Sequence, residues 1–348
     1  MTAPPELFRH FPVLRQRLAW TALARPTPVT SLPRLGAQLR GPAVWLKRED
    51  RTSERCGGCE ARELEFLFGT ALRRGAQRLL AFGHVGSRRC LALAAFAQHF
   101  ELETILALGG GTAEPNVQGT LQMELALGAE LHRLDGGPLA LFRLVRRCAR
   151  GTVRRGGPRF LFVVWPGQAA LLGALGTVNA VFELQRQLRC GIVPEPERLY
   201  AGTDSVPTLA GLAVGAELIG LRAPVVCTVG RAQQRAVLRL AGRTLAFLHR
   251  HLHDSCPQTL PATRFEFHAA ADSTPTPQQA ARLLRDLEAL ELPSPAGAAA
   301  MAALVGDRRA GRVHGPVLFW YTDAPPPQEA AAPLAALPRE FRAFSVPS

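Results

Sequence analysis

The feature that most constrains the fold is the alternation of short apolar runs with longer helical segments along the chain. Five apolar runs predict strands, at residues 79–82, 104–108, 160–164, 225–229 and 317–321. Alternation of this kind predicts an α/β protein with open parallel sheets. Such sheets bind ligands at the carboxyl ends of their strands, where we expect the loops 83–87 and 202–207.

Length and composition narrow the class of protein. With 348 residues, the chain exceeds the usual size of one domain, so we expect two domains or one large α/β unit. No apolar run approaches the roughly 20 residues of a membrane span, and residues 1–15 lack a signal-peptide pattern. Seven dispersed cysteines fit reduced thiols better than a disulfide framework. We therefore expect a cytoplasmic protein without a membrane segment.

The formal charge of +13 raises the question of a nucleic-acid partner. The basic residues look scattered in pairs such as Arg73 and Arg74 or Arg146 and Arg147, without interleaved aromatic residues. We interpret them as a solvated surface and do not expect nucleic acid, which would require arginines clustered on one face. Lys47 is the only lysine among the 41 basic residues.

Several motifs follow one another in a recognisable order. They are Trp45–Asp50 (WLKRED), Gly57–Gly58 with Glu63–Leu67, Phe82–Ser87 (FGHVGS), Gly173–Ala180 (GALGTVNA), Ala210–Gly215 and Phe319–Thr322. Together they resemble the 1-aminocyclopropane-1-carboxylate (ACC) deaminase and D-cysteine desulfhydrase family over roughly residues 26–322. That family consists of pyridoxal-phosphate (PLP) enzymes with a tryptophan synthase β-like fold (PLP fold type II).

The resemblance implies a domain organisation. A large α/β domain would be discontinuous, with residues 1–54 and 166–348, and a small α/β domain would be inserted at 55–165. In the family, the cofactor lies between the two domains, and dimers are common. We therefore expect a homodimer, or a heteromer with an active relative.

The lysine that PLP chemistry needs is absent from its expected place. The family carries it in a Gly-Gly-Asn-Lys segment, whereas this chain has Gly57–Glu60 with the sequence GGCE. Glu60 cannot form a Schiff base with PLP. The resemblance assigns a structural role to Lys47, because the family has a lysine there in addition to the active one.

The phosphate-binding loop has also changed. In place of the family's glycine-rich loop the chain has Asp204–Thr208 with the sequence DSVPT. Asp204 adds negative charge, and Pro207 removes a backbone donor. Ser205 and Thr208 remain as vestigial cofactor-binding residues.

Further changes fall on the substrate loop and the last core strand. Where the family has Ser-Asn-His, this chain has Ser87, Arg88 and Arg89, so Ser87 and Arg89 are vestigial substrate-binding positions and Arg88 a vestigial cofactor-binding one. The catalytic tyrosine position holds Ala296. The family's final His-Thr-Gly-Gly reads Tyr321–Ala324 (YTDA), in which Thr322 is a vestigial cofactor contact.

These changes together predict a pseudoenzyme, with no catalytic residue expected at the degenerate positions Glu60, Ala296 and Tyr321. We expect no cofactor, although the family uses PLP, and no metal. The protein would then act through protein partners or as a scaffold.

Two enzymatic alternatives stay open. One is a PLP-dependent amino-acid lyase or deaminase with an unorthodox site, which only Lys47 could support. The other is a repurposed, PLP-independent enzyme that uses Glu60, Cys59 and Arg88. If side chains of the protein itself occupy the position that the cofactor has in the family, we expect Glu60 to pair with Arg88 or Arg89.

Cysteine and histidine clusters suggest weaker alternatives. Cys56 and Cys59 form a CxxC pair, to which His84 and Cys90 could add ligands, but no second CxxC exists. We interpret the pair as ordinary thiols and His249, His251 and His253 as a surface cluster.

Overall fold

The computed structural model describes residues 4–111, 115–135, 137–154, 160–268, 275–325, 327 and 331–344. The chain divides into two units. Unit 1 consists of Met1–Ser53, Gly57–Phe66 and Ala170–Pro325. Unit 2 consists of Glu54–Cys56, Leu67–Ala169 and Pro326–Ser348, so the C-terminal segment groups with it. The domain boundaries predicted at residues 55 and 165 stay a prediction.

The described strands of unit 1 form a six-stranded sheet in the order β1-β2-β10-β7-β8-β9. Their bounds are β1 Val29–Leu32, β2 Val44–Arg48, β7 Arg198–Gly202, β8 Val225–Cys227, β9 Phe265–Phe267 and β10 Val317–Tyr321. Only β1 runs antiparallel to its neighbour, and the other pairs are parallel. All of β10 is buried, as expected for an unbroken apolar run in the centre of a parallel sheet.

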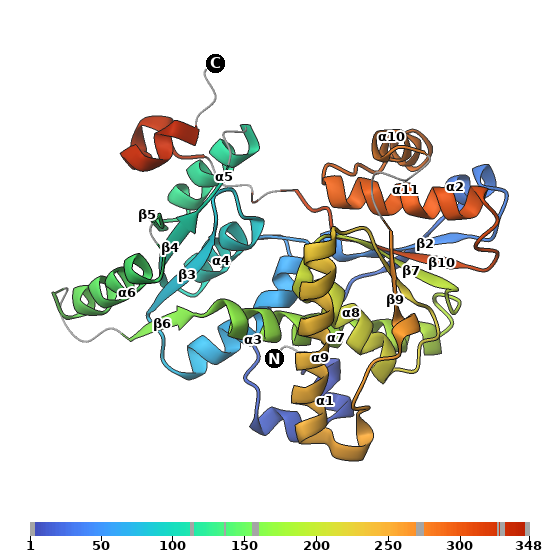
Figure 1. Cartoon of the computed structure of the whole chain (residues 1–348), viewed down its shortest axis with the longest axis horizontal. Coiled ribbons are helices and arrows are strands. Elements are labelled where there is room, and N and C mark those ends of the chain that lie inside the picture. Colours follow the sequence, from blue (N-terminus) through green and yellow to red (C-terminus); the bar gives the residue numbers. More distant parts are fainter. Residues whose placement is uncertain are drawn as a thin grey trace. The chain divides into compact units, whose positions relative to one another are not determined.

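Helices cover both faces of this sheet (Figure 1). On one face lie α2, α10 and α11, and on the other α7, α8 and α9. The bounds of the helices in unit 1 are α1 Glu6–His10, α2 Pro33–Gln38, α7 Pro166–Arg189 (whose first four residues belong to unit 2), α8 Val206–Leu218, α9 Arg231–Leu252, α10 Pro277–Glu288 and α11 Pro295–Arg309.

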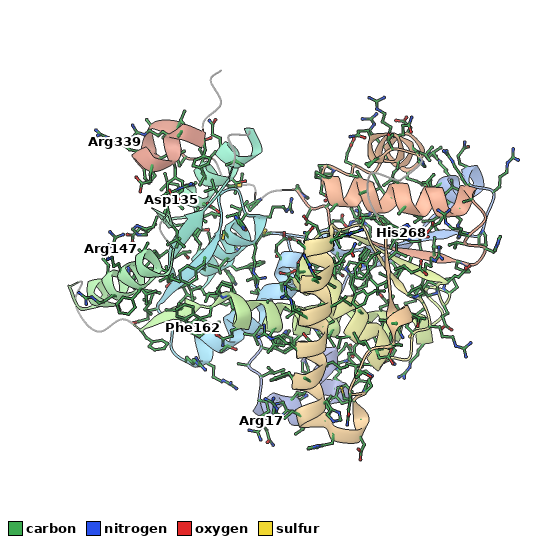
Figure 2. The ribbon with its side chains drawn as sticks, viewed as in Figure 1. Arg17, Asp135, Arg147, Phe162, His268 and Arg339 are labelled. Carbon is green, nitrogen blue, oxygen red and sulfur yellow. The ribbon has the colours of Figure 1, made fainter. Side chains whose placement is uncertain are left out.

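Unit 2 has a four-stranded sheet, entirely parallel, in the order β5-β4-β3-β6. Its strands are β3 Arg78–His84, β4 Glu103–Gly109, β5 Glu130–Arg133 and β6 Leu161–Val164. Its helices are α4 Arg88–His99, α5 Pro115–Ala126 and α6 Gly137–Arg154, and α3 Cys59–Arg73 begins in unit 1 and ends in unit 2. Phe162 on β6 lies under the guanidinium of Arg74, 5.7 Å from its ring centre (Figure 2).

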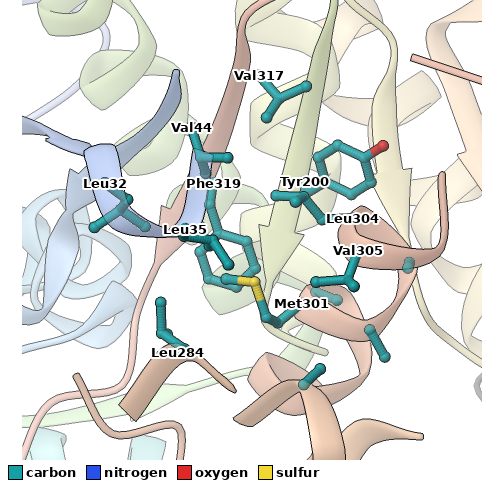
Figure 3. Packing of buried hydrophobic residues seen from close by; sticks show 14 of the residues in the cluster. Leu32, Leu35, Val44, Tyr200, Leu284, Met301, Leu304, Val305, Val317 and Phe319 are labelled. Atoms are coloured by element: carbon teal, nitrogen blue, oxygen red, sulfur yellow. The ribbon is translucent and has the colours of Figure 1, made fainter. Parts of the chain in front are cut away.

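The hydrophobic core of unit 1 joins the sheet to α2, α10 and α11 (Figure 3). Phe319 of β10 and Tyr200 of β7 pack there against Met301 and Leu304 of α11. Burying a side chain of this size contributes about 1.5–3 kcal/mol, so this layer holds α11 on the sheet.

Small residues let the helices on the other face approach closely. A Cβ at Gly176 of α7 would lie 1.9 Å from the carbonyl oxygen of Arg62 in α3. A Cβ at Gly211 of α8 would lie 2.5 Å from the carbonyl oxygen of Ala174. The GALGTVNA motif therefore works as a packing surface between α3 and α8.

The expected α/β class with parallel sheets is confirmed. Among the described residues, no helix is both long and apolar enough to cross a membrane.

Candidate functional site

The N-terminus of α8 lies directly after β7, at the carboxyl end of the sheet in unit 1. Ser205 is the N-cap, and its side chain accepts a hydrogen bond from the backbone N–H of Thr208 at 3.4 Å. Pro207 stands in the first turn, where its missing N–H interrupts no helical bond. The positive end of the helix dipole and the two hydroxyls make this end of α8 attractive to an anion.

The anion at this place is a side chain of the protein itself. The Glu63 carboxylate, from α3, accepts a hydrogen bond from the Thr208 hydroxyl at 2.7 Å and another from the Ser205 hydroxyl. Only 2% of Glu63 is exposed. A Cβ at Gly173 would lie 3.3 Å from the Glu63 Cβ, so the glycine leaves room for this side chain. We call Cys59, Glu63, Ser205 and Thr208 the α8 cluster.

Glu63 was not predicted as a site residue. It stands three residues after Glu60, and residues at this spacing share a face of a helix. The vestigial donors Ser205 and Thr208, in contrast, were predicted, and the structure brings them together on one carboxylate. The spacing places Glu60 and Glu63 on one face of α3, but it does not identify the hydroxyls that Glu63 binds.

Cys59 is buried in the same cluster. Its Sγ lies 3.7 Å from Glu60 Oε2 and 3.9 Å from Thr203 Oγ1. Burial, and then the carboxylates of Glu60 and Glu63, raise the pKa of the Cys59 thiol well above its usual value. A thiol held in this way is a poor nucleophile at neutral pH.

The remaining predicted positions of unit 1 lie on or near β10. The Thr322 hydroxyl donates to the carbonyl oxygen of Gly202 at 2.8 Å, and the Tyr321 hydroxyl donates to that of Glu291 at 2.5 Å. Burial, and then Asp50 and Asp323, raise the pKa of Tyr321. Ala296 stands in the first turn of α11, next to the N-cap Ser294.

Ser87, Arg88 and Arg89 lie in unit 2, at the N-terminus of α4. Ser87 is the N-cap and accepts from the backbone N–H of Cys90 at 3.4 Å. Arg89 donates to the carbonyl oxygen of Ala169 at 3.0 Å, and Arg88 is exposed. Glu60 belongs to unit 1, so its pairing with Arg88 or Arg89 stays a prediction.

The only lysine is part of a buried ion network, which consists of Lys47, Glu49, Arg62 and Glu183. Lys47 Nζ donates to Glu183 Oε1 at 2.5 Å and to the carbonyl oxygen of Thr27 at 2.8 Å. Arg62 binds the other Glu183 oxygen at 2.9 Å and Glu49 at 3.1 Å. Two cations thus face two carboxylates, and Lys47 is 0% exposed.

The network also sets the protonation of its members. Burial lowers the pKa of Lys47, and Glu183 and Glu49 oppose that shift. Burial would raise the pKa of Glu183, but Arg62 and Lys47 more than offset it, so that pKa lies below its usual value. The carboxylates of Glu183 and Glu49 thus offset only part of the cost of burying the charged amine, and the geometry of the network holds Lys47 Nζ against Glu183.

The cysteine and histidine clusters gather no metal ligands in the part of the chain that the structure describes. There, no three His, Cys, Asp or Glu side chains are grouped as a metal ion requires. Cys56 and Cys59 are buried, and neither is in a disulfide. The ring of His249 is hydrogen-bonded through Nδ1 to the carbonyl oxygen of Cys256 at 2.8 Å.

The sequence matches the model of the family described as "Pyridoxal-phosphate dependent enzyme" over residues 21–323. The D-cysteine desulfhydrase of Salmonella schwarzengrund is 29% identical over 315 residues, which cover 87% of this chain and 93% of that protein. The Pyrococcus horikoshii protein named "Putative 1-aminocyclopropane-1-carboxylate deaminase" is 31% identical over 208 residues. That match spans 59% of this chain and only 61% of the Pyrococcus protein's length.

Among solved structures, the crystal structure of an ACC deaminase homologue superposes with a TM-score of 0.71 at 22% identity. It covers 94% of this chain and 97% of its own chain. A fungal L-serine ammonia-lyase from Rhizomucor miehei gives a TM-score of 0.57 at 18% identity. These neighbours show the fold, which is PLP fold type II.

The family match corrects the expectation that no cofactor belongs to this protein. That expectation is wrong, because the matching family is PLP-dependent and the relatives point to PLP. The side chains of this chain do not fit the covalent form of that cofactor, since Glu60 stands in the lysine position and Lys47 is bound in the ion network. At the N-terminus of α8, the hydroxyls that suit a phosphate already bind Glu63.

Proposed function

Because the chain belongs to the family of pyridoxal-phosphate dependent enzymes, we propose that it is a non-catalytic homologue of the deaminases and desulfhydrases. The observation that carries the proposal is the place of Lys47. It is the only lysine of the chain, and its ammonium is bound to Glu183 and Thr27 in a fully buried network. No other lysine amine is available for a Schiff base, the linkage that this class of chemistry needs.

The α8 cluster supports the same proposal. A carboxylate accepts from both hydroxyls at the helix terminus, and the pKa of the neighbouring thiol is raised. Neither feature favours a nucleophile or a general base at this edge of the sheet. Loss of catalysis at Glu60, Ala296 and Tyr321 is therefore part of the proposal.

A protein without chemistry of its own acts through binding. We propose that this chain works in the cytoplasm as a homodimer, or as a heteromer with an active relative, and that it serves as a scaffold or a modifying partner. The support is the likeness to enzymes of a fold that commonly dimerises. Sedimentation velocity tests it: a species of twice the chain's 37.6 kDa is expected, alone or with the relative added. A monomer under both conditions would contradict it.

A second candidate is a PLP-dependent amino-acid lyase, favoured by similarity to D-cysteine desulfhydrases over 87% of the chain. It would require Lys47 to leave the ion network. A repurposed enzyme that uses Glu60, Cys59 and Arg88 has less support, because the raised pKa of Cys59 disfavours its thiolate.

Turnover assays separate these candidates. Sulfide release from D-cysteine and ammonia release from ACC are measured with PLP supplied, beside the Salmonella D-cysteine desulfhydrase as a positive control. We expect no product above the buffer blank from this chain. Turnover that Lys47→Arg abolishes in a folded variant would establish the lyase instead, and turnover that needs Cys59 but no PLP would establish the repurposed enzyme.

A further inference from the structure

The exposed face of α9 in unit 1 is a ladder of arginines. Arg231, Arg235, Arg239 and Arg243 follow one another at intervals of four residues, and Arg250 continues the ladder near the end of the helix. All five are exposed. At about 1.5 Å per residue, the ladder extends over roughly 28 Å of the helix axis.

The helix that carries the ladder is fixed on the protein. Its opposite face is buried, with Val237, Leu240, Ala241, Thr244, Leu245, Leu248 and Leu252. In Figure 1, α9 lies on the side of α7 and α8, and it packs against α8. The guanidinium groups are therefore presented from a rigid support, which lowers the entropy lost when they bind a partner.

No acidic side chain of the helix balances these charges. From residue 218 to residue 253 the sequence contains neither Asp nor Glu. Within the described residues, Arg231, Arg235, Arg239 and Arg250 form no ion pair. The side chains of α9 therefore contribute only positive charge to this surface.

Other cations extend the positive surface at the C-terminal end of α9. Arg17 lies beside this end of the helix (Figure 2). Burial, and then Arg17, Arg250 and His253, lower the pKa of His251. The charge therefore comes from two segments that are far apart in the sequence.

The composition of the face indicates which partner fits it. Interfaces between proteins are built around an apolar centre, in which arginine occurs together with large aromatic side chains and Met. Here arginines occupy the centre of the face, and Leu238 at its edge is the only large exposed hydrophobic side chain of the helix. A duplex nucleic acid presents a dense row of phosphates and gains affinity by releasing counterions, without apolar burial. The half-buried Phe247 packs on His251, so no exposed aromatic ring of α9 is free to stack on bases.

We propose that the exposed face of α9 binds the phosphate backbone of a nucleic-acid duplex without sequence preference. The arginines looked scattered in the sequence because their four-residue spacing becomes a single face only on a helix. The inference is independent of whether the protein is catalytic. The sequence alone predicts no nucleic-acid partner, and the arrangement of the arginines on α9 is the reason for proposing one.

Fluorescence anisotropy with a fluorescein-labelled 24-base-pair DNA duplex tests the proposal on the full chain. With about four or five phosphates neutralised, the slope of log K against log salt is expected to be about −4, at roughly −0.9 per phosphate contact. The double variant R235Q/R239Q should make this slope less steep by about 2 and weaken binding at low salt at least tenfold.

The matched control is R282Q/R285Q, which removes two exposed arginines from α10 and changes the net charge equally. Its affinity and slope should stay within twofold of the unmodified protein. Equal losses in both variants would mean diffuse attraction to a basic protein and would overturn the proposal. Tighter binding of a 20-residue poly-glutamate peptide or of anionic vesicles than of DNA would also overturn it, in favour of an acidic protein or a membrane surface. Urea unfolding verifies that both variants are folded.

Discussion

Helix α3 contributes to two buried polar groups that differ in what neutralises their carboxylates. In the ion network, Glu183 faces the ammonium of Lys47 and the guanidinium of Arg62. In the α8 cluster, Glu63 accepts from the hydroxyls of Ser205 and Thr208 at a helix N-terminus. The ion network links β2 and α3 to α7. The α8 cluster occupies the carboxyl end of the sheet, where α/β proteins of this kind bind ligands. The ion network therefore stabilises the packing of unit 1, whereas the α8 cluster determines which ligands its candidate site can accept.

Glu124 of unit 2 is a third buried glutamate, and it differs from the other two in what surrounds its carboxyl group. It is 0% exposed, and neither carboxyl oxygen has a hydrogen-bond partner among the described residues. Burial raises its pKa to about 8. Three buried glutamates thus have cations, hydroxyls or no partner among the described residues, and each should respond differently when it is disturbed.

The largest effect is expected from Lys47→Met. Removing one member of a buried charge network leaves a carboxylate undercompensated, which costs about 3–5 kcal/mol of the free energy of unfolding. Urea unfolding measures it. The control is Arg9→Met, which removes a largely exposed partner of Glu6 and should cost about 0–1 kcal/mol. If both variants lost the same amount, the network would not be what stabilises unit 1.

Glu124 predicts a pH dependence of the opposite sign from that of a paired carboxylate. Its pKa in the folded protein, about 8, exceeds the usual 4.5. The stability it contributes is complete below pH 4.5 and is lost as the pH rises toward 8. Between pH 5 and pH 9, unfolding should become easier by about 2–4 kcal/mol, and Glu124→Met should flatten that part of the profile. An unchanged slope in the variant would mean that Glu124 is ionised in the folded state.

A double-mutant cycle measures the bond between Glu63 and Thr208. Glu63→Gln removes the charge at the helix terminus, and Thr208→Val removes the donor with little change of shape. A hydrogen bond to a charged group is worth about 1.5–3 kcal/mol, so we expect a coupling of about 1–2 kcal/mol because Gln retains an acceptor. Additive effects of the two variants would show that the 2.7 Å contact contributes nothing.

The smallest expected effect is the difference in stability loss between Ser205→Ala and Ser87→Ala. These are the two serines that the chain shares with the motifs of the family. Ser87 caps α4, whereas Ser205 caps α8 and also donates to Glu63. Loss of an N-cap costs about 1 kcal/mol. Ser205→Ala should therefore cost about 1 kcal/mol more than Ser87→Ala in unfolding experiments, because it also loses the bond to a buried carboxylate. Equal costs would reduce Ser205 to an ordinary cap.

The sequence predicted the elements whose pattern is local. The strand predicted at 317–321 matches β10, whereas the loop predicted at 83–87 is shorter in the structure, because β3 extends to His84. The antiparallel β1 was missed because its four residues show no alternation that distinguishes them from a loop. At the site, the vestigial Ser205 and Thr208 were predicted, but the carboxylate they bind lies 142 residues away from Ser205. A contact at that separation depends on the packing of α3 against α8, which no local pattern encodes.

The central claim is that Lys47 belongs to the fold and not to the chemistry of the family, and one measurement tests it most directly. The purified chain is incubated with PLP and reduced with sodium borohydride, and its peptides are mapped by mass spectrometry. We predict no adduct on Lys47 in the folded protein, but modification of Lys47 when the same reaction is run in 6–8 M urea, roughly the range that unfolds small proteins. A stoichiometric adduct on Lys47 in the folded protein would contradict the claim and restore the lyase as the function of this chain.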